Sequence, residues 1–154
     1  GVGRDVFSRI LPQLAQARIP IMTTWNAADR IAESDYLYWG RPNTWGQRSA
    51  NVLIQQTDLL ISIGSRLGLQ QTGFNWQGFV PLGKVIQVDI DEMELTKGHP
   101  KIELGIQSDS ENFLERFVEI TKNEINPGQR DEWLDFGRYV REILPLSEII
   151  NSKS

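Results

Sequence analysis

The sequence contains no cysteine and a single histidine, His99. Without cysteine the chain can form no disulfide, no thiolate metal site and no cysteine nucleophile, a composition that fits the reducing cytoplasm where we expect this protein. One histidine in the polar stretch KGHPK leaves almost no room for a catalytic triad or a site with several histidine ligands. We therefore expect no catalytic residue and no metal site in this chain.

Long apolar runs and clusters of positive charge are missing too. No stretch approaches the roughly 20 apolar residues that cross a membrane, and nothing resembles a signal peptide. The 16 basic residues are outnumbered by 20 acidic ones, the net charge is −4, and no cluster of lysine and arginine could bind a phosphate backbone. These features predict that the protein binds neither a membrane nor a nucleic acid.

The sequence does contain an alternation of strand-like and helix-like segments. Near-continuous apolar runs at 19–24, 58–63 and 83–91 predict buried strands, and 101–109 repeats the pattern more weakly. Apolar residues at helical spacing predict helices between these strands and after the last one, around 7–14, 46–57, 110–121 and 133–144. Buried strands separated by amphipathic helices predict an α/β fold, a Rossmann-like doubly wound parallel sheet with helices on both faces.

Local signals refine this prediction. Pro12 lies inside the first helical pattern and is expected to kink or divide that helix. Ser108, Asp109 and Ser110 are good N-cap candidates for the helix that follows. The aromatic loop DYLYWGRPNTWG at 35–46 is expected to pack onto the core more readily than to hold a ligand. The stretch NPGQ at 126–129 breaks the chain before the last helix.

Unusual residues gather where the predicted strands end. Ligands of open parallel sheets lie beyond the carboxyl ends of the strands. Glycine there lets the backbone approach a ligand, free amides at a helix start attract anions, arginine binds phosphate, and an acid can accept from a ribose hydroxyl. Together these corners suggest a nucleotide site; they are Gly1-Val2-Gly3, Thr23-Thr24-Trp25, Gly64-Ser65-Arg66, Asp89-Ile90-Asp91 and Ser108-Asp109.

Each corner also has an ordinary structural explanation. Strand-end glycines serve turns, Asp89 and Asp91 can cap the short helix EMELTK, and Arg66 can pair with a neighbouring carboxylate. GVGRDV also lacks the third glycine of the G-x-G-x-x-G pattern. One corner alone favours the structural explanation, whereas the set on one rim leaves the two explanations equally good.

The corners and the segments between them resemble the central domain of thiamine-diphosphate-dependent enzymes, closest to the acetolactate synthase large subunit. The resemblance extends over residues 1–125, and most of it is carried by SANVLIQQTDLLISIGSRL joined to VIQVDIDEMELTK. Shorter matches are GVG, IPIMTTW, QTG and IQSD. The combination is far more specific than any single piece.

The resemblance implies a larger parent enzyme. The family also has a pyrimidine-binding domain with an activating glutamate and a diphosphate-binding domain with a Gly-Asp-Gly magnesium motif, and the sequence contains no GDG. We accordingly expect residues 1–125 to form the central domain, and 126–154 to form a helix and linker toward a diphosphate-binding domain. The parent would join or cleave 2-keto acids with thiamine diphosphate and magnesium as a homo-oligomer, and this chain alone would be inactive.

The resemblance also implies a cofactor groove. Acetolactate synthases hold FAD in the central domain, some relatives hold ADP and others hold nothing. The implied contacts are Gly1, Gly3, Thr24, Trp25, Gly64, Ser65, Arg66, Asp89, Ile90 and Asp109. The fold further implies an apolar strand before the first glycine loop, in the centre of the sheet.

Several positions depart from the flavin-binding pattern. Gly68 and Leu69 replace two acids of that pattern, Gln70 replaces an arginine, and Trp25 replaces a leucine. Because polar and cationic contacts are lost, we expect the isolated chain to be purified without flavin. The alternative to an enzyme piece is a free-standing nucleotide-binding or regulatory module, because fold does not fix function.

Overall fold

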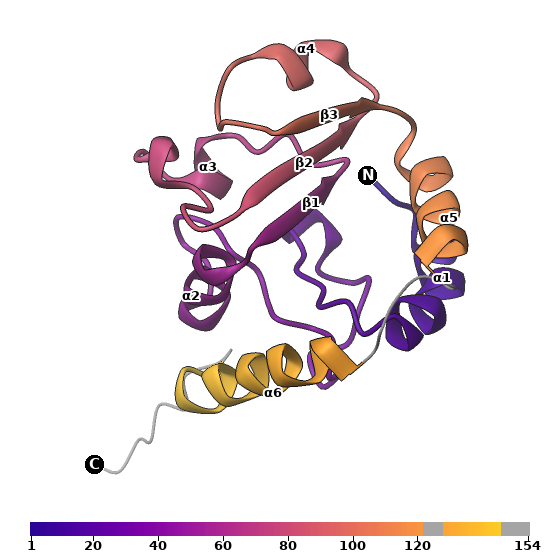
Figure 1. The fold of residues 1–154 in the computed structure, drawn as a ribbon, viewed down its shortest axis with the longest axis vertical. Helices are drawn as coiled ribbons and strands as arrows, with labels where there is room; N and C mark the ends of the chain where they lie inside the picture. The colour runs from indigo at the N-terminus through magenta and orange to yellow at the C-terminus, as the bar shows by residue number, and fades with distance from the viewer. Residues whose placement is uncertain (122–127, 146–154) are drawn as a thin grey trace.

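The computed structural model describes residues 1–121 and 128–145. Helices alternate with strands along the chain (Figure 1). The elements are α1 (Arg4–Gln16), η1 (Trp25–Ala27), α2 (Arg48–Gln56), β1 (Leu59–Ile63), α3 (Leu69–Thr72), η2 (Trp76–Gly78), β2 (Lys84–Asp89), α4 (Glu92–Thr96), β3 (Leu104–Gln107), α5 (Ser110–Thr121) and α6 (Gly128–Ile143).

The strands form one parallel sheet in the order β1-β2-β3. Leu60 of β1 packs against one apolar core and Ile63 against another. Because these two positions differ in parity, their side chains lie on opposite faces of the sheet. Helices α1 and α5 lie side by side near the strand tips, and α6 lies at the far side of the molecule against α2 (Figure 1). The predicted α/β Rossmann-like fold is confirmed.

The predicted strand at 19–24 is wrong. Within this segment only Ile21 forms a bridge, to Tyr38 in the aromatic loop. The Ile21 amide donates to Leu37 O at 2.8 Å and the Ile21 carbonyl accepts from Trp39 N at 2.8 Å. The segment is extended, as its apolar run predicted, but its hydrogen bonds go to a loop and not to the sheet.

Helix α1 continues through Pro12, so the expected division of this helix is wrong. A proline in a helix removes its own amide from the ladder and disturbs the carbonyl four residues earlier. Both Pro12 and Ser8, which carries that carbonyl, are exposed. Water can therefore replace the missing hydrogen bond, and the helix tolerates the proline.

Strand β1 has a partner on one side only. Lys84 N donates to Asp58 O at 2.9 Å and Gly64 N donates to Val88 O at 2.8 Å, which places the even-numbered residues of this segment on the β2 side. In a parallel ladder the odd-numbered residues then direct their N–H and C=O groups the other way. Within residues 1–121 and 128–145 no strand pairs with that second edge. The strand that the resemblance implies beside β1 is therefore not among the described elements.

Helix α6 is held to the rest of the chain by apolar packing and by Arg141. The Arg141 guanidinium donates to Glu33 O at 2.8 Å and Asp35 O at 3.4 Å. Burial lowers the pKa of Arg141, against the raising effect of nearby groups such as Glu33. On the same helix Gly137 lies directly against the Trp39 indole, where a Cβ atom would come within 2.8 Å of Trp39 Nε1 and closer to its ring carbons. This close contact packs the aromatic loop tightly against α6.

Candidate functional site

Three strand-end corners meet at the carboxyl edge of the sheet. Gly64 follows β1 and has a φ of +61°, a conformation that favours glycine. A Cβ atom on Gly64 would lie 2.8 Å from Gly1 Cα and would overlap Ser110 Oγ. The glycine loop at the N-terminus, the end of β1 and the start of α5 therefore touch one another.

The glycine loop is held by two side chains that the sequence analysis did not identify. The Gly3 amide donates to Glu111 Oε1 at 2.7 Å, and the Val2 carbonyl accepts from Arg30 Nε at 3.1 Å. The Gly3 amide is therefore not a free donor for an anion. Glu111 and Arg30 are far from the loop in sequence, and the only local signal was the place of Glu111 in the first turn of α5.

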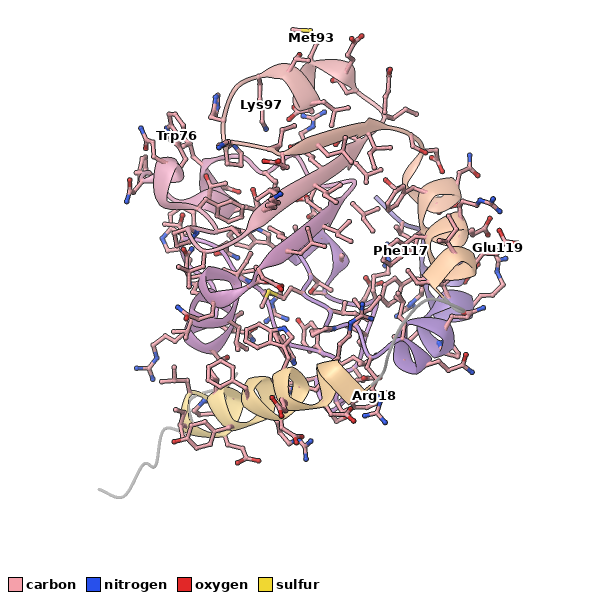
Figure 2. The ribbon with its side chains drawn as sticks, viewed as in Figure 1. Arg18, Trp76, Met93, Lys97, Phe117 and Glu119 are labelled. Carbon is pink, nitrogen blue, oxygen red and sulfur yellow. The ribbon has the colours of Figure 1, made fainter. Side chains whose placement is uncertain are left out.

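The Gly64-Ser65-Arg66 corner is fixed through its carbonyl groups. The Ser65 carbonyl accepts from Gln87 Nε2 at 3.3 Å and from Ser62 Oγ at 3.4 Å. Lys97 Nζ, at the α4 end of the molecule (Figure 2), donates to the Arg66 carbonyl. Lys97 was not among the predicted residues.

The Arg66 side chain is 79% exposed, and its Nε lies 3.7 Å from Glu94 Oε1. This ion pair is the ordinary structural role that the sequence allowed for Arg66 as the alternative to binding phosphate. Glu94 also contacts Lys97 Nζ at 2.8 Å, so it lies between two cations. Exposure leaves the guanidinium able to reach a ligand, although a carboxylate already stands next to it.

The predicted acids act as caps and turn acceptors. Asp109 Oδ1 accepts from Glu111 N at 2.9 Å and from Asn112 N at 3.0 Å, which confirms the predicted N-cap of α5. Asp91 Oδ1 accepts from Met93 N at 3.0 Å and caps α4. Asp89 is buried and accepts from Asp91 N at 3.1 Å, so it holds the turn and does not cap α4 as proposed. The three aspartates therefore have the ordinary structural role, as helix caps or turn acceptors, that the sequence allowed as the alternative to nucleotide binding.

Ile90, at the carboxyl end of β2, and Trp25, in η1, are apolar and exposed, and within the described residues no contact brings Trp25 to the three corners that meet. Ile90 follows Asp89 directly and is 70% exposed. Thr24 precedes η1 as its N-cap residue, and the Trp25 ring lies 6.3 Å from the Trp45 ring. The aromatic loop was predicted to pack onto the core, and Tyr38 and Trp39 do so, whereas Trp45 is 70% exposed.

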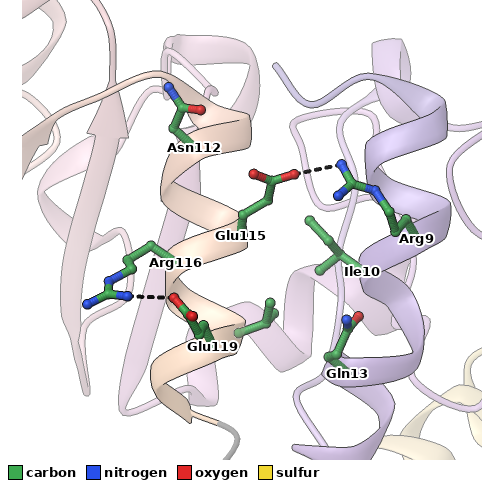
Figure 3. A pocket seen from close by; sticks show the side chains of 8 residues that line it. Arg9, Ile10, Gln13, Asn112, Glu115, Arg116 and Glu119 are labelled. Carbon is green, nitrogen blue, oxygen red and sulfur yellow. Dashed lines mark hydrogen bonds and ion pairs between the residues drawn. The ribbon is translucent and has the colours of Figure 1, made fainter.

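A hollow between α1 and α5 lies apart from these corners (Figure 3). Its charged side chains pair with one another, Arg9 with Glu115 at 2.6 Å and Arg116 with Glu119 at 2.5 Å. None of the residues implied by the resemblance lines it. It offers no set of free groups converging on a ligand, and the carboxyl rim remains the candidate site.

Two further kinds of feature, a metal site and a membrane span, are absent from the described residues. The described part of the chain contains no group of histidine, cysteine, aspartate or glutamate side chains arranged to hold a metal ion. Among the helices of residues 1–121 and 128–145, none combines the length and the apolar character needed to span a bilayer.

Comparison with known proteins agrees with this arrangement. Residues 4–117 match the family model described as thiamine pyrophosphate enzyme, central domain. The chain is 35% identical over 128 residues to the acetolactate synthase large subunit of Corynebacterium glutamicum, which covers 82% of this chain and 20% of that protein.

Two further relatives carry similar names. The acetolactate synthase of Mycobacterium avium is 33% identical over 150 residues, covering 96% of this chain and 24% of its own length. The acetolactate synthase isozyme 1 large subunit of Escherichia coli is 32% identical over 127 residues, covering 82% of this chain and 21% of its own length. The chain thus spans about a quarter or less of the relatives it matches, and it belongs to the thiamine pyrophosphate enzyme family, whose central domain it represents.

Proposed function

We propose that the chain is the central domain of an acetolactate synthase-like enzyme that acts on 2-keto acids. The observation that carries this proposal is the similarity to acetolactate synthases along 82–96% of the chain, in a stretch that makes up only 20–24% of those proteins. A free-standing module gains no support from these matches. We assign residues 1–125 to the central domain, and 126–154 to a helix and linker toward the diphosphate-binding domain.

The chemistry of the parent lies outside this chain. Thiamine diphosphate and magnesium, bound by the other domains of the parent, would supply the chemistry that joins or cleaves 2-keto acids. The residues described here supply scaffold and contacts to the neighbouring domains, in a cytoplasmic homo-oligomer.

We further propose that the carboxyl rim binds the diphosphate of FAD or ADP. The backbone amides of residues 65–67 donate no hydrogen bond within the described ranges, and Arg66 is 79% exposed beside them. Free amides next to a guanidinium suit a phosphate oxygen. Gly1, Gly3, Thr24 and Trp25 would border the ligand on one side, and Gly64, Ser65, Asp89, Ile90 and Asp109 on the other.

Titration calorimetry with ADP and with FAD tests this proposal. Replacing Arg66 by Ala should weaken ADP binding roughly 10–100-fold, equivalent to about 1–3 kcal/mol for a lost charge-assisted hydrogen bond. The matched control is Arg116→Ala, because Arg116 is also exposed and paired with a glutamate, but lies on α5 among residues that line the separate hollow. Equal affinities of the two variants would show that Arg66 does not contact the ligand. The absence of ADP and FAD binding by every form of the chain, including a Glu111→Gln variant, would remove the nucleotide proposal.

A further inference from the structure

The glycine loop already binds an anionic group of the same chain, the Glu111 carboxylate. Glu111 Oε1 accepts the Gly3 amide at 2.7 Å, and a Cβ atom on Gly3 would lie 2.7 Å from the same oxygen. The carboxylate therefore lies directly against the backbone that leads into α1. A helix N-terminus attracts negative charge, so this place is electrostatically favourable for a carboxylate.

The Glu111 side chain can extend to the glycine loop because it does not cap its own helix, α5. Asp109 Oδ1 accepts the amides of both Glu111 and Asn112 at the start of α5. A glutamate in the first turn of a helix often folds back to an amide of that helix. Here the cap is supplied by Asp109, and the Glu111 side chain extends to another element.

Among the described residues, no lysine or arginine forms an ion pair with the Glu111 carboxylate itself. The Arg30 Nε donates to the Val2 carbonyl, and the Arg30 and Arg4 guanidinium groups lie near Asp29. An incoming diphosphate would thus find its backbone donor occupied and would bring further negative charge beside a carboxylate. The negative charges of the diphosphate and of the Glu111 carboxylate repel one another, and this repulsion weakens binding of the diphosphate.

We infer that Glu111 is a built-in competitor that occupies the phosphate-binding amide of the glycine loop. The inference rests on the proposed function, since it assigns to that nucleotide site the residue that restricts it. A diphosphate engages the loop only when the Glu111 carboxylate leaves Gly3. The side chain therefore sets how strongly the rim discriminates against anionic ligands.

The test compares Glu111→Gln with Glu115→Gln. Both changes remove one negative charge from the α5 side that faces α1, but Glu115 pairs with Arg9 of α1, whereas Glu111 accepts from the Gly3 amide of the loop. Binding of inorganic pyrophosphate, ADP and adenosine is measured by calorimetry. We expect E111Q to bind pyrophosphate and ADP about tenfold more tightly than E115Q, the scale of one interaction with a charged group, and adenosine with the same affinity.

The outcomes separate the inference from the proposed site. If ADP binds to both variants with equal affinity, the site stands and Glu111 does not compete. Weaker binding of ADP to E111Q would also overturn the inference, because Glu111 would then position the ligand. If neither pyrophosphate nor ADP binds to any form of the chain, including E111Q, the nucleotide site and the competitor both fail.

A second variant guards against loss of folding. Glu111→Asp keeps the charge but shortens the side chain by one methylene, so its carboxylate no longer covers the Gly3 amide. We expect E111D to bind pyrophosphate more tightly than the wild-type chain and less tightly than E111Q. An affinity equal to that of the wild-type chain would show that the contact itself does not exclude the ligand.

Discussion

At the scale of single residues, the site depends on glycines that allow segments to touch. Gly64 and Gly73 both have positive φ values, +61° and +77°. A side chain on Gly64 would meet Gly1 and Ser110, whereas one on Gly73 would meet nothing within 4 Å. The two positions therefore share a backbone requirement and differ in the space around them.

We expect Gly64→Ala to destabilise the chain more than Gly73→Ala. The Gly73 variant should lose about 1–3 kcal/mol, because a φ of 77° with a ψ of 172° is a conformation that L-residues avoid. The Gly64 variant should lose a further ~1–3 kcal/mol from overpacking against the glycine loop and α5. Urea denaturation of both variants measures the difference. Equal losses would mean that the three corners can separate without cost.

The predicted site residues differed in how local their interactions are. Asp91 and Asp109 each bond to amides two or three residues away, and the cap of α5 followed from its local sequence pattern. The contacts of Glu111 with Gly3 and of Arg30 with Val2 join residues 108 and 28 positions apart. Such contacts depend on how elements pack, and no periodicity in a single sequence specifies them.

At the scale of elements, apolar periodicity was a sound guide wherever a segment had its own packing face. Helices α2, α5 and α6 and strands β1, β2 and β3 lie where their patterns placed them. The run at 19–24 has the composition of a strand, but composition does not specify a partner, and its bridge is to Tyr38. Pro12 predicted a division that α1 does not show. The effect of a proline on a helix depends on whether water can reach the carbonyl group four residues earlier.

The contact between α6 and the aromatic loop makes a prediction with an inverted sign. Alanine in place of glycine inside a helix normally stabilises a protein by about 0.5–1 kcal/mol. At Gly137 the added methyl would overlap the Trp39 ring, so Gly137→Ala should destabilise by ~1–3 kcal/mol. Thermal denaturation of G137A checks this.

The control places the same change on a smaller partner. In a Trp39→Leu background the added methyl has room, so G137A should be neutral or stabilising there. The opposite signs in the two backgrounds would identify steric overlap with the indole as the cause. A loss of stability that is the same in both backgrounds would place the strain within α6 itself.

At the scale of the whole molecule, the family resemblance and the fold describe the same unit. The family model matches residues 4–117, and this range includes the whole sheet together with α1 and most of α5. Helix α6 lies beyond that range yet packs against α2 and the core. Helix α6 therefore lies outside the residues that the family model matches, and we propose that it leads toward the next domain of the parent.

The one-sided pairing of β1 should be visible in amide hydrogen exchange. The amides of Leu60 and Ser62 face β2 and should exchange slowly, whereas those of Ile61 and Ile63 face the second edge and should exchange much faster. Exchange followed by NMR, residue by residue, would show this alternation along a single strand. Uniform protection from Leu60 to Ile63 would contradict it, since both edges of β1 would then be paired. In a longer protein that contains this domain, slowing confined to Ile61 and Ile63 would report a new neighbour of β1 without any further structure determination.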